Sequence, residues 1–266
     1  MTKLACIDAH IHLDMYEERR QKSLLADAKQ SGVEAVVAVS MHLASCKATR
    51  ELASRHTPYI IPAYGYHPEQ PVPGKLEADK LFDWLQQRYE AGEQFAIGEV
   101  GLPYYLRTEK AEAGELFDEQ PYVDLLVRFV ELAAKWNRPI VLHAVYEDAA
   151  KACELLEKHR VTKAHFHWFK GDRAVVRRMA QAGYYISVTP DVQYEEEIKE
   201  LVRQYPLELI MVETDGPWPF EGRYEGLETV PAMALDAAVC IAELKGLPAE
   251  QAAAELMANT KRFYGI

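Results

Sequence analysis

Short hydrophobic runs alternate with longer amphipathic stretches from one end of the chain to the other. Apolar runs of this length, bounded by polar or turn residues, are typical of buried β-strands. The pattern predicts eight strands, at residues 4–12, 35–40, 59–66, 95–100, 140–143, 163–168, 184–188 and 209–213.

The amphipathic stretches between these runs have the spacing of helices with one buried face. They predict helices at residues 23–30, 43–55, 76–90, 120–136, 147–159, 173–182 and 195–204. Several of these stretches end at helix-stop residues such as Ser31-Gly32 and Ala182-Gly183. Eight alternating units predict right-handed crossovers and a parallel sheet, and hence an α/β fold of the TIM (β/α)8 barrel type.

No Pro/Gly/Ser-rich linker divides the chain, so residues 1–266 are predicted to form a single barrel domain. Residues 231–266 add two helical stretches, broken at residues 245–248, which suit packing on the outside of the barrel. Residues 101–119 form the longest irregular segment. Because it follows the fourth strand, it is a candidate lid or substrate wall.

The composition narrows the class of protein. The net charge of −11 argues against broad electrostatic attraction to nucleic acid, although a metal centre could supply positive charge locally. The four cysteines are scattered and predict reduced packing thiols. No apolar run approaches the length of a membrane span, which predicts a soluble cytoplasmic protein without membrane contact.

Two histidines two residues apart, His10 and His12, lie in the first predicted strand. Because side chains alternate along a strand, both point the same way and could bind one metal ion. Asp8 is expected on the same face, where its carboxylate could accept the proton on the far nitrogen of an imidazole. On spacing alone, coincidence is about as probable as a metal site.

Polar side chains at the ends of other strands extend this pair into a pattern. They are His67, Glu99, His143, His165, His167 and Asp215. The carboxyl ends of parallel barrel strands share one face, so these groups converge although they are far apart in the sequence. Imidazoles and carboxylates without cysteine suit zinc, manganese or similar ions.

The ordered motifs resemble those of the TatD family of metal-dependent hydrolases, within the amidohydrolase superfamily. The resemblance covers nearly the whole chain and is carried by Asp8-Ala9-His10-Ile11-His12-Leu13, Gly65-Tyr66-His67-Pro68, Gly98-Glu99-Val100-Gly101-Leu102, His143, His167-Trp168-Phe169-Lys170-Gly171, Glu213-Thr214-Asp215-Gly216-Pro217 and Asn259-Thr260-Lys261-Arg262-Phe263. Each motif alone is weak, but the ordered set is specific.

The resemblance implies two divalent metal ions, of which His10, His12 and Asp215 would hold one. His143 and His167 would hold the other, with Glu99 bridging the two. Two ions about 4 Å apart lower the pKa of a bound water and polarise a phosphoryl or carbonyl oxygen. Imidazole-rich ligation makes magnesium less natural than zinc or manganese, and the sequence leaves the metal and the oligomeric state open.

The remaining roles concern proton transfer and the substrate. Asp215 could take the proton of the attacking water, and His67 would contact the substrate phosphate or leaving group. Glu213 and His165 are expected to support the ligands rather than bind metal. The aromatic residues Trp168, Trp218 and Phe220 are candidates for stacking on bases, although loop packing is the more common role for such residues.

The chain departs from the family pattern where the substrate would lie. Pro103 replaces a common aspartate, and Val145 replaces an arginine whose guanidinium would partner a phosphate. Trp168 and Lys170 replace a small cysteine and serine. Lys170 is the better candidate for restoring a phosphate contact, whereas Arg107 and Arg173 are expected to be solvated.

Three functions follow from these residues. The first is phosphodiester hydrolysis of the deoxyribonuclease type, acting on nucleic-acid ends. The second is hydrolysis of a small amide, lactone or ester, which the net acidity and the missing arginine favour. The third is a catalytically silent metal-binding subunit, against which stands the complete set of ligands.

Overall fold

Eight parallel strands form one sheet in sequence order in the computed structural model, which describes residues 4–266. The strands are β1 (Cys6–Ile11), β2 (Val33–Ala38), β3 (Ile60–Tyr64), β4 (Ala96–Gly101), β5 (Ile140–His143), β6 (Ala164–Phe166), β7 (Tyr185–Val188) and β8 (Ile210–Val212). Ile11 pairs with Gly216, just after β8, and the His12 N–H donates to the Gly216 carbonyl at 2.8 Å. The predicted (β/α)8 barrel is confirmed.

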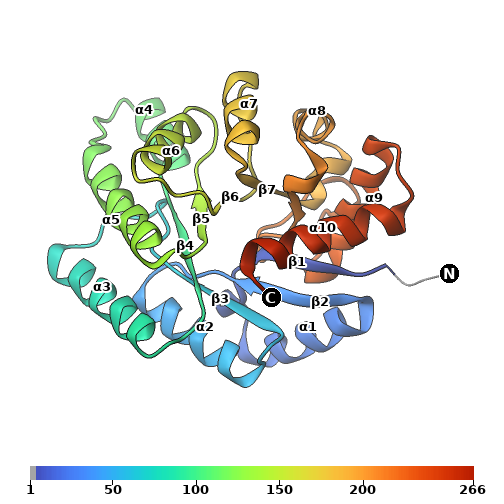
Figure 1. Cartoon of the computed structure of the whole chain (residues 1–266), viewed down its shortest axis with the longest axis horizontal. Helices are drawn as coiled ribbons and strands as arrows, with labels where there is room; N and C mark the ends of the chain where they lie inside the picture. The colour runs from blue at the N-terminus through green and yellow to red at the C-terminus, as the bar shows by residue number, and fades with distance from the viewer. Residues whose placement is uncertain (1–3) are drawn as a thin grey trace.

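Helices surround the strands, as Figure 1 shows. They are α1 (Glu18–Ser31), α2 (Leu43–Arg55), α3 (Lys75–Glu90), α4 (Tyr104–Glu112), α5 (Gln120–Trp136), α6 (Glu147–Lys158), α7 (Arg173–Ala182), α8 (Glu196–Gln204), α9 (Ala234–Lys245) and α10 (Ala249–Tyr264). The break predicted between the last two helices is confirmed at Gly246, whose left-handed backbone ends α9. None of the helices in the described range is long and apolar enough to cross a membrane.

The barrel interior is divided between a hydrophobic layer and a polar one. Val37, Val39, Ala63, Ala96 and Val141 form a buried cluster separate from the main core between strands and helices. Val141 lies two residues before His143 on β5, so both side chains share the inner face of that strand. The apolar layer therefore supports a layer of histidines and carboxylates at the carboxyl ends of the strands.

Strand β1 does not alternate regularly. Asp8 pairs with Val36 and Ile11 pairs with Ala38, so three steps along β1 face two steps along β2. Such an irregularity turns one side chain to the other face. The prediction that Asp8 shares the histidine face and supports an imidazole was wrong for this reason: its carboxylate instead accepts hydrogen bonds from Thr214 and from the backbone N–H of His10.

Most strands are shorter than the hydrophobic pattern predicted. β1 ends at Ile11 and β6 ends at Phe166, so His12 and His167 lie one residue beyond their strands. His67 likewise follows β3 by three residues. These three histidines therefore lie in the loops that follow the strands, where the backbone is free to depart from strand geometry.

Residues 101–119, predicted to be irregular, contain the helix α4. No residue of α4 is buried, which explains why its sequence lacks a clear apolar face. The first turn is held instead by Glu69, whose carboxylate accepts from the backbone N–H groups of Tyr105 at 2.9 Å and Leu106 at 2.6 Å. A contact from a distant loop cannot be inferred from local periodicity.

The C-terminal helix α10, red in Figure 1, packs against β1 and β8. The buried amide of Asn259 donates to the carbonyls of Leu207 at 2.7 Å and Ile210 at 2.8 Å, at the entry to β8. At the end of the helix, the Tyr264 hydroxyl lies 2.9 Å from Nδ1 of His165, inside the barrel. The contacts of Asn259 fix the position of β8, and with it Asp215.

Replacing Asn259 with alanine should lower the free energy of unfolding by about 2–3 kcal/mol, because the buried carbonyl of Ile210 and the partly buried carbonyl of Leu207 both lose their donor. Urea denaturation followed by circular dichroism measures this change. The control is Gln251→Ala, an exposed position on the same helix, for which we expect a change within about 0.5 kcal/mol. Equal effects of the two substitutions would contradict the role given to Asn259.

Candidate metal centre

The predicted ligands gather at the carboxyl end of the barrel and are all buried. His10, Glu99 and His143 come from β1, β4 and β5, whereas the others lie in the loops that follow β1, β6 and β8. The structure thus brings together His10, His12, Glu99, His143, His167 and Asp215, with His67 beside them.

Four atoms form the first group: Nε2 of His10, Nε2 of His12, Oδ1 of Asp215 and Oε2 of Glu99. Glu99 Oε2 lies 3.1 Å from His10 Nε2 and 3.3 Å from His12 Nε2. Asp215 Oδ1 lies 3.3 Å from each imidazole nitrogen. Ligand atoms arranged tetrahedrally at zinc-like distances are separated from one another by about 3.3 Å, so this group fits one metal ion.

The second group meets at the other oxygen of Glu99. Its Oε1 lies 2.7 Å from His167 Nε2 and 3.1 Å from His143 Nδ1, and these two nitrogens are 3.1 Å apart. His67 Nε2 is also near, at 3.2 Å from the same oxygen. One carboxylate therefore faces a different set of imidazoles with each of its oxygens, which is the geometry expected of a bridging ligand.

Many atoms of the cluster make no hydrogen bond with any part of residues 4–266. They are Nδ1 and Nε2 of His10 and His12, Nδ1 of His167, Oε2 of Glu99 and Glu213, and Oδ1 of Asp215. Burying such atoms without partners is costly, and binding a cation would offset that cost. The donor set, all imidazole and carboxylate, suits divalent transition metals.

Glu213 lies behind the ligands rather than among them. Its carboxylate oxygens are 3.9 Å from His10 Nδ1 and 3.8 Å from His167 Nδ1, on the sides of these rings that face away from Glu99. The two rings are stacked, with centres 3.9 Å apart. Glu213 therefore has the supporting position expected of it, and it takes the role predicted for Asp8.

The charges of the cluster favour a bound cation. Burial lowers the pKa of His12, but contacts with Asp215 and Glu99 outweigh this and raise it to about 9. Burial also lowers the pKa of His143, but contacts with Glu69 and Glu99 outweigh this effect and raise it to about 9. Burial raises the pKa of Glu99, yet the surrounding imidazoles hold it well below its ordinary value. In the metal-free protein, the protons on these imidazoles balance the negative charge of the carboxylates, as bound metal ions would.

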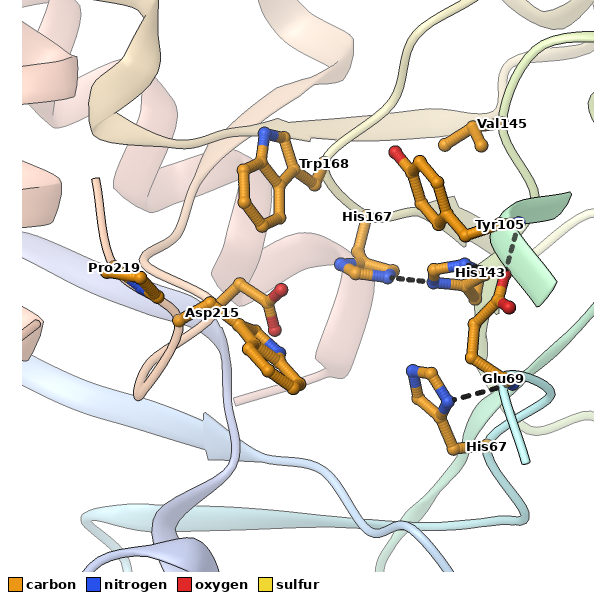
Figure 2. A pocket seen from close by; sticks show the side chains of 10 residues that line it. His67, Glu69, Tyr105, His143, Val145, His167, Trp168, Asp215 and Pro219 are labelled. Atoms are coloured by element: carbon orange, nitrogen blue, oxygen red, sulfur yellow. Dashed lines mark hydrogen bonds and ion pairs between the residues drawn. The ribbon is translucent and has the colours of Figure 1, made fainter. Parts of the chain in front are cut away.

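A cavity of about 420 Å³ opens above the ligands. It is lined by His67, Glu69, Tyr105, His143, Val145, His167, Trp168, Asp215, Trp218 and Pro219. Figure 2 shows His167 between Trp168 on one side and Tyr105 on the other. The sequence did not predict Glu69 or Tyr105 as residues of the site. Glu69 could have been expected there, because it lies two residues after His67, in a loop at the end of the barrel that carries the ligands.

The substrate-facing predictions have mixed outcomes. Trp168 lines the cavity, and its indole N–H donates to Asp191 at 2.6 Å. Lys170 is absent from the lining, and its Nζ lies 5.9 Å from the centre of the Trp168 ring. Arg107 is committed to an ion pair with Asp148 at 2.7 Å. Phe220 is buried in packing with Tyr224 rather than exposed to the cavity.

A family model described as "TatD related DNase" matches residues 7–265. The chain belongs to the TatD family. An uncharacterized metal-dependent hydrolase of Haemophilus influenzae is 36% identical to it over 261 residues, covering 97% of this chain and 99% of the relative. The human protein named deoxyribonuclease TATDN3 is 30% identical over 251 residues, covering 92% and 89%.

The fold comparison agrees with the family. The crystal structure of YjjV, a TatD homologue from Escherichia coli, superposes with a TM-score of 0.82 at 24% identity and covers 98% of both chains. The family model and the curated relatives identify this chain as an enzyme, a metal-dependent hydrolase, and the superposition shows that it has the family's barrel.

Metal binding should release protons below pH 9, because His12 and His143 hold protons there that a metal must displace. Since both pKa values are raised, apparent affinity should increase from pH 6 to pH 9, by up to about tenfold per pH unit for each proton displaced, and then level off. Calorimetric titration of metal-free protein in buffers of different ionisation enthalpy counts the protons. A pH-independent affinity would refute this assignment.

Glu99→Ala should abolish binding of the metal pair and hydrolysis, because both ligand groups lose the carboxylate they share. Metal content after equilibrium dialysis is the measurement. Glu34→Ala removes an exposed carboxylate from β2 and serves as the control. A Glu99→Ala protein that retained two ions per chain would show that the bridging assignment is wrong.

Proposed function

We propose that this TatD enzyme hydrolyses phosphodiester bonds at nucleic-acid ends with two divalent metal ions. The proposal rests on the position of Glu99, whose two carboxylate oxygens face two separate sets of imidazoles at 2.7–3.3 Å. A binuclear centre stabilises both the attacking and the leaving oxygen of a displacement at phosphorus. The name of the human relative, a deoxyribonuclease, supports the same reaction.

His10, His12 and Asp215 would hold one ion, and His143 and His167 the other, with Glu99 shared between them. When bound, the ions would lower the pKa of a water molecule and polarise the phosphoryl oxygen. Asp215 is suited to take the proton of that water. Burial opposes its ionisation, but contacts with His10 and His12 hold its pKa below the ordinary value and keep it a carboxylate.

His67 is suited to donate a hydrogen bond to the phosphate or leaving group. Its Nδ1 accepts from the backbone N–H of Glu69 at 3.1 Å, so a neutral ring carries its proton on Nε2, the nitrogen that faces the metal centre. Burial lowers the pKa of His67 and favours this neutral form. The ring therefore offers a fixed donor next to Glu99.

The cavity is suited to a terminal nucleotide rather than to a long strand. Its volume of about 420 Å³ lies in the range of sites for single small ligands. Trp168, anchored through Asp191, presents a rigid aromatic wall on which a base could stack. Lys170, near this ring, remains the candidate for a phosphate contact at the rim.

A second candidate function rests on a different observation. No lysine or arginine lines the cavity in the described part of the chain, Val145 stands at the position of the family's arginine, and Glu69 adds a carboxylate. An anionic wall disfavours a phosphate and suits a neutral amide, lactone or ester. The same metal-activated water would then attack a carbonyl carbon.

Assays of the Mn²⁺- or Zn²⁺-loaded enzyme separate the two reactions. We expect release of mononucleotides from single-stranded DNA and hydrolysis of a generic aryl phosphodiester. Lactones and amides should react at least about 100-fold more slowly if the site stabilises displacement at phosphorus by several kcal/mol more than attack on carbon.

The Glu99→Ala protein is the negative control, since any turnover that survives this substitution comes from a contaminant. Turnover of only the carbonyl substrates would overturn the phosphodiesterase proposal in favour of the second candidate. A loaded enzyme without turnover of any of these substrates would contradict both.

A further inference from the structure

The loop after β3 carries a carboxylate that touches the metal centre from outside. Glu69 Oε1 lies 3.2 Å from Nε2 of His143, and the Glu69 side chain is 16% exposed. The other nitrogen of this imidazole, Nδ1, faces Glu99 and His167 at 3.1 Å. His143 is therefore held between two carboxylates, one on each nitrogen.

This arrangement sets the hydrogen-bonding state of the ring. A neutral imidazole has one N–H donor and one acceptor nitrogen. When Nδ1 binds a cation, the ring proton is therefore on Nε2, where the Glu69 carboxylate accepts it. A carboxylate in this position also makes the ligating nitrogen more basic and fixes the plane of the ring.

The carboxylate itself is fixed by helix α4. Its two oxygens accept from the first backbone N–H groups of the helix, those of Tyr105 and Leu106. These N–H groups have no partner inside the helix and carry its positive dipole end, so they hold an anion well. Helix α4 is held in turn by the ion pair of Arg107 with Asp148.

The backbone of the same residue orients a second imidazole. The Glu69 N–H donates to His67 Nδ1 at 3.1 Å, which directs His67 Nε2 toward Glu99. One residue thus fixes His143 through its side chain and His67 through its backbone. Figure 2 shows Glu69 beside both rings, at the edge of the cavity.

We propose that Glu69 is a positioning residue for the metal ion held by His143 and His167, and that it links helix α4 to this ion. The inference rests on the proposed binuclear centre. Within residues 4–266, Glu69 makes no hydrogen bond or ion pair with His10, His12 or Asp215, the residues that would hold the other ion, so we expect it to act on one ion of the pair only.

Stepwise titration of the metal-free protein with Co²⁺, followed by calorimetry and visible absorption, tests the inference. Glu69→Ala should weaken the second binding step by about 10- to 100-fold and leave the first unchanged. Glu69→Gln keeps one oxygen for the α4 N–H groups but loses the charge, so it should be more stable than Glu69→Ala and recover only part of the affinity.

The matched control is Glu119→Gln, which removes a carboxylate that pairs with Arg107 and Lys151 but touches no imidazole. It should leave both binding steps unchanged. If Glu69 only capped the helix, Glu69→Ala would lower the melting temperature without affecting Co²⁺ binding, and Glu69→Gln would bind both ions as tightly as the wild type. Either result would overturn the inference.

A readout on metal-free protein separates this inference from the proposed function. Nitrogen-15 NMR of the imidazoles at pH 10, above the pKa of about 9 at which His143 loses its second proton, should show a larger share of the Nε2–H form of His143 in the wild type than in Glu69→Ala. A wild type that binds one ion, or that hydrolyses no phosphodiester, would contradict the proposed function while the NMR comparison still decides the role of Glu69. An unchanged His143 signal in Glu69→Ala would refute it.

Discussion

One buried carboxylate determines the design of this protein. Glu99 is fully buried, and five imidazoles surround its carboxylate. One oxygen faces His10 and His12, and the other faces His67, His143 and His167. A carboxylate in this position is tolerable only where positive charge surrounds it, so imidazoles or cations must approach it from several directions. A closed barrel of parallel strands meets that requirement, because each strand delivers its last side chain to the same axis.

The sequence predicted the barrel and the ligands because both depend on strong local signals. Strand runs, helix stops and polar residues at strand ends recur in a fixed order, and His10, Glu99 and His143 could be placed from that order alone. The errors concern contacts between distant segments. The extra residue in β1 moved Asp8 off the histidine face, and helix α4 depends on Glu69, which lies in another loop. Periodicity within a segment contains no information about either contact.

The walls of the cavity differ in character from its floor. The floor atoms must satisfy the distances of metal coordination, which leaves little freedom in residue type. The walls have no such constraint, and here they combine Trp168, Tyr105 and Val145 with a carboxylate from Glu69. Membership of the TatD family therefore identifies the reaction machinery more securely than the substrate. The aromatic walls favour a planar group. Among residues 4–266, no lysine or arginine lines the cavity, which leaves charge neutralisation to bound metal.

Closure of the barrel joins the two ends of the chain at the metal centre. His10 lies on the first strand, whereas its partner Asp215 follows the last one. From the final helix, Asn259 donates to the carbonyl of Ile210 in β8, and Tyr264 contacts His165 in β6. The first ligand group is therefore complete only when the segment after β8 has closed onto β1, and a chain interrupted within α10 would carry every ligand yet lack the support that holds them together.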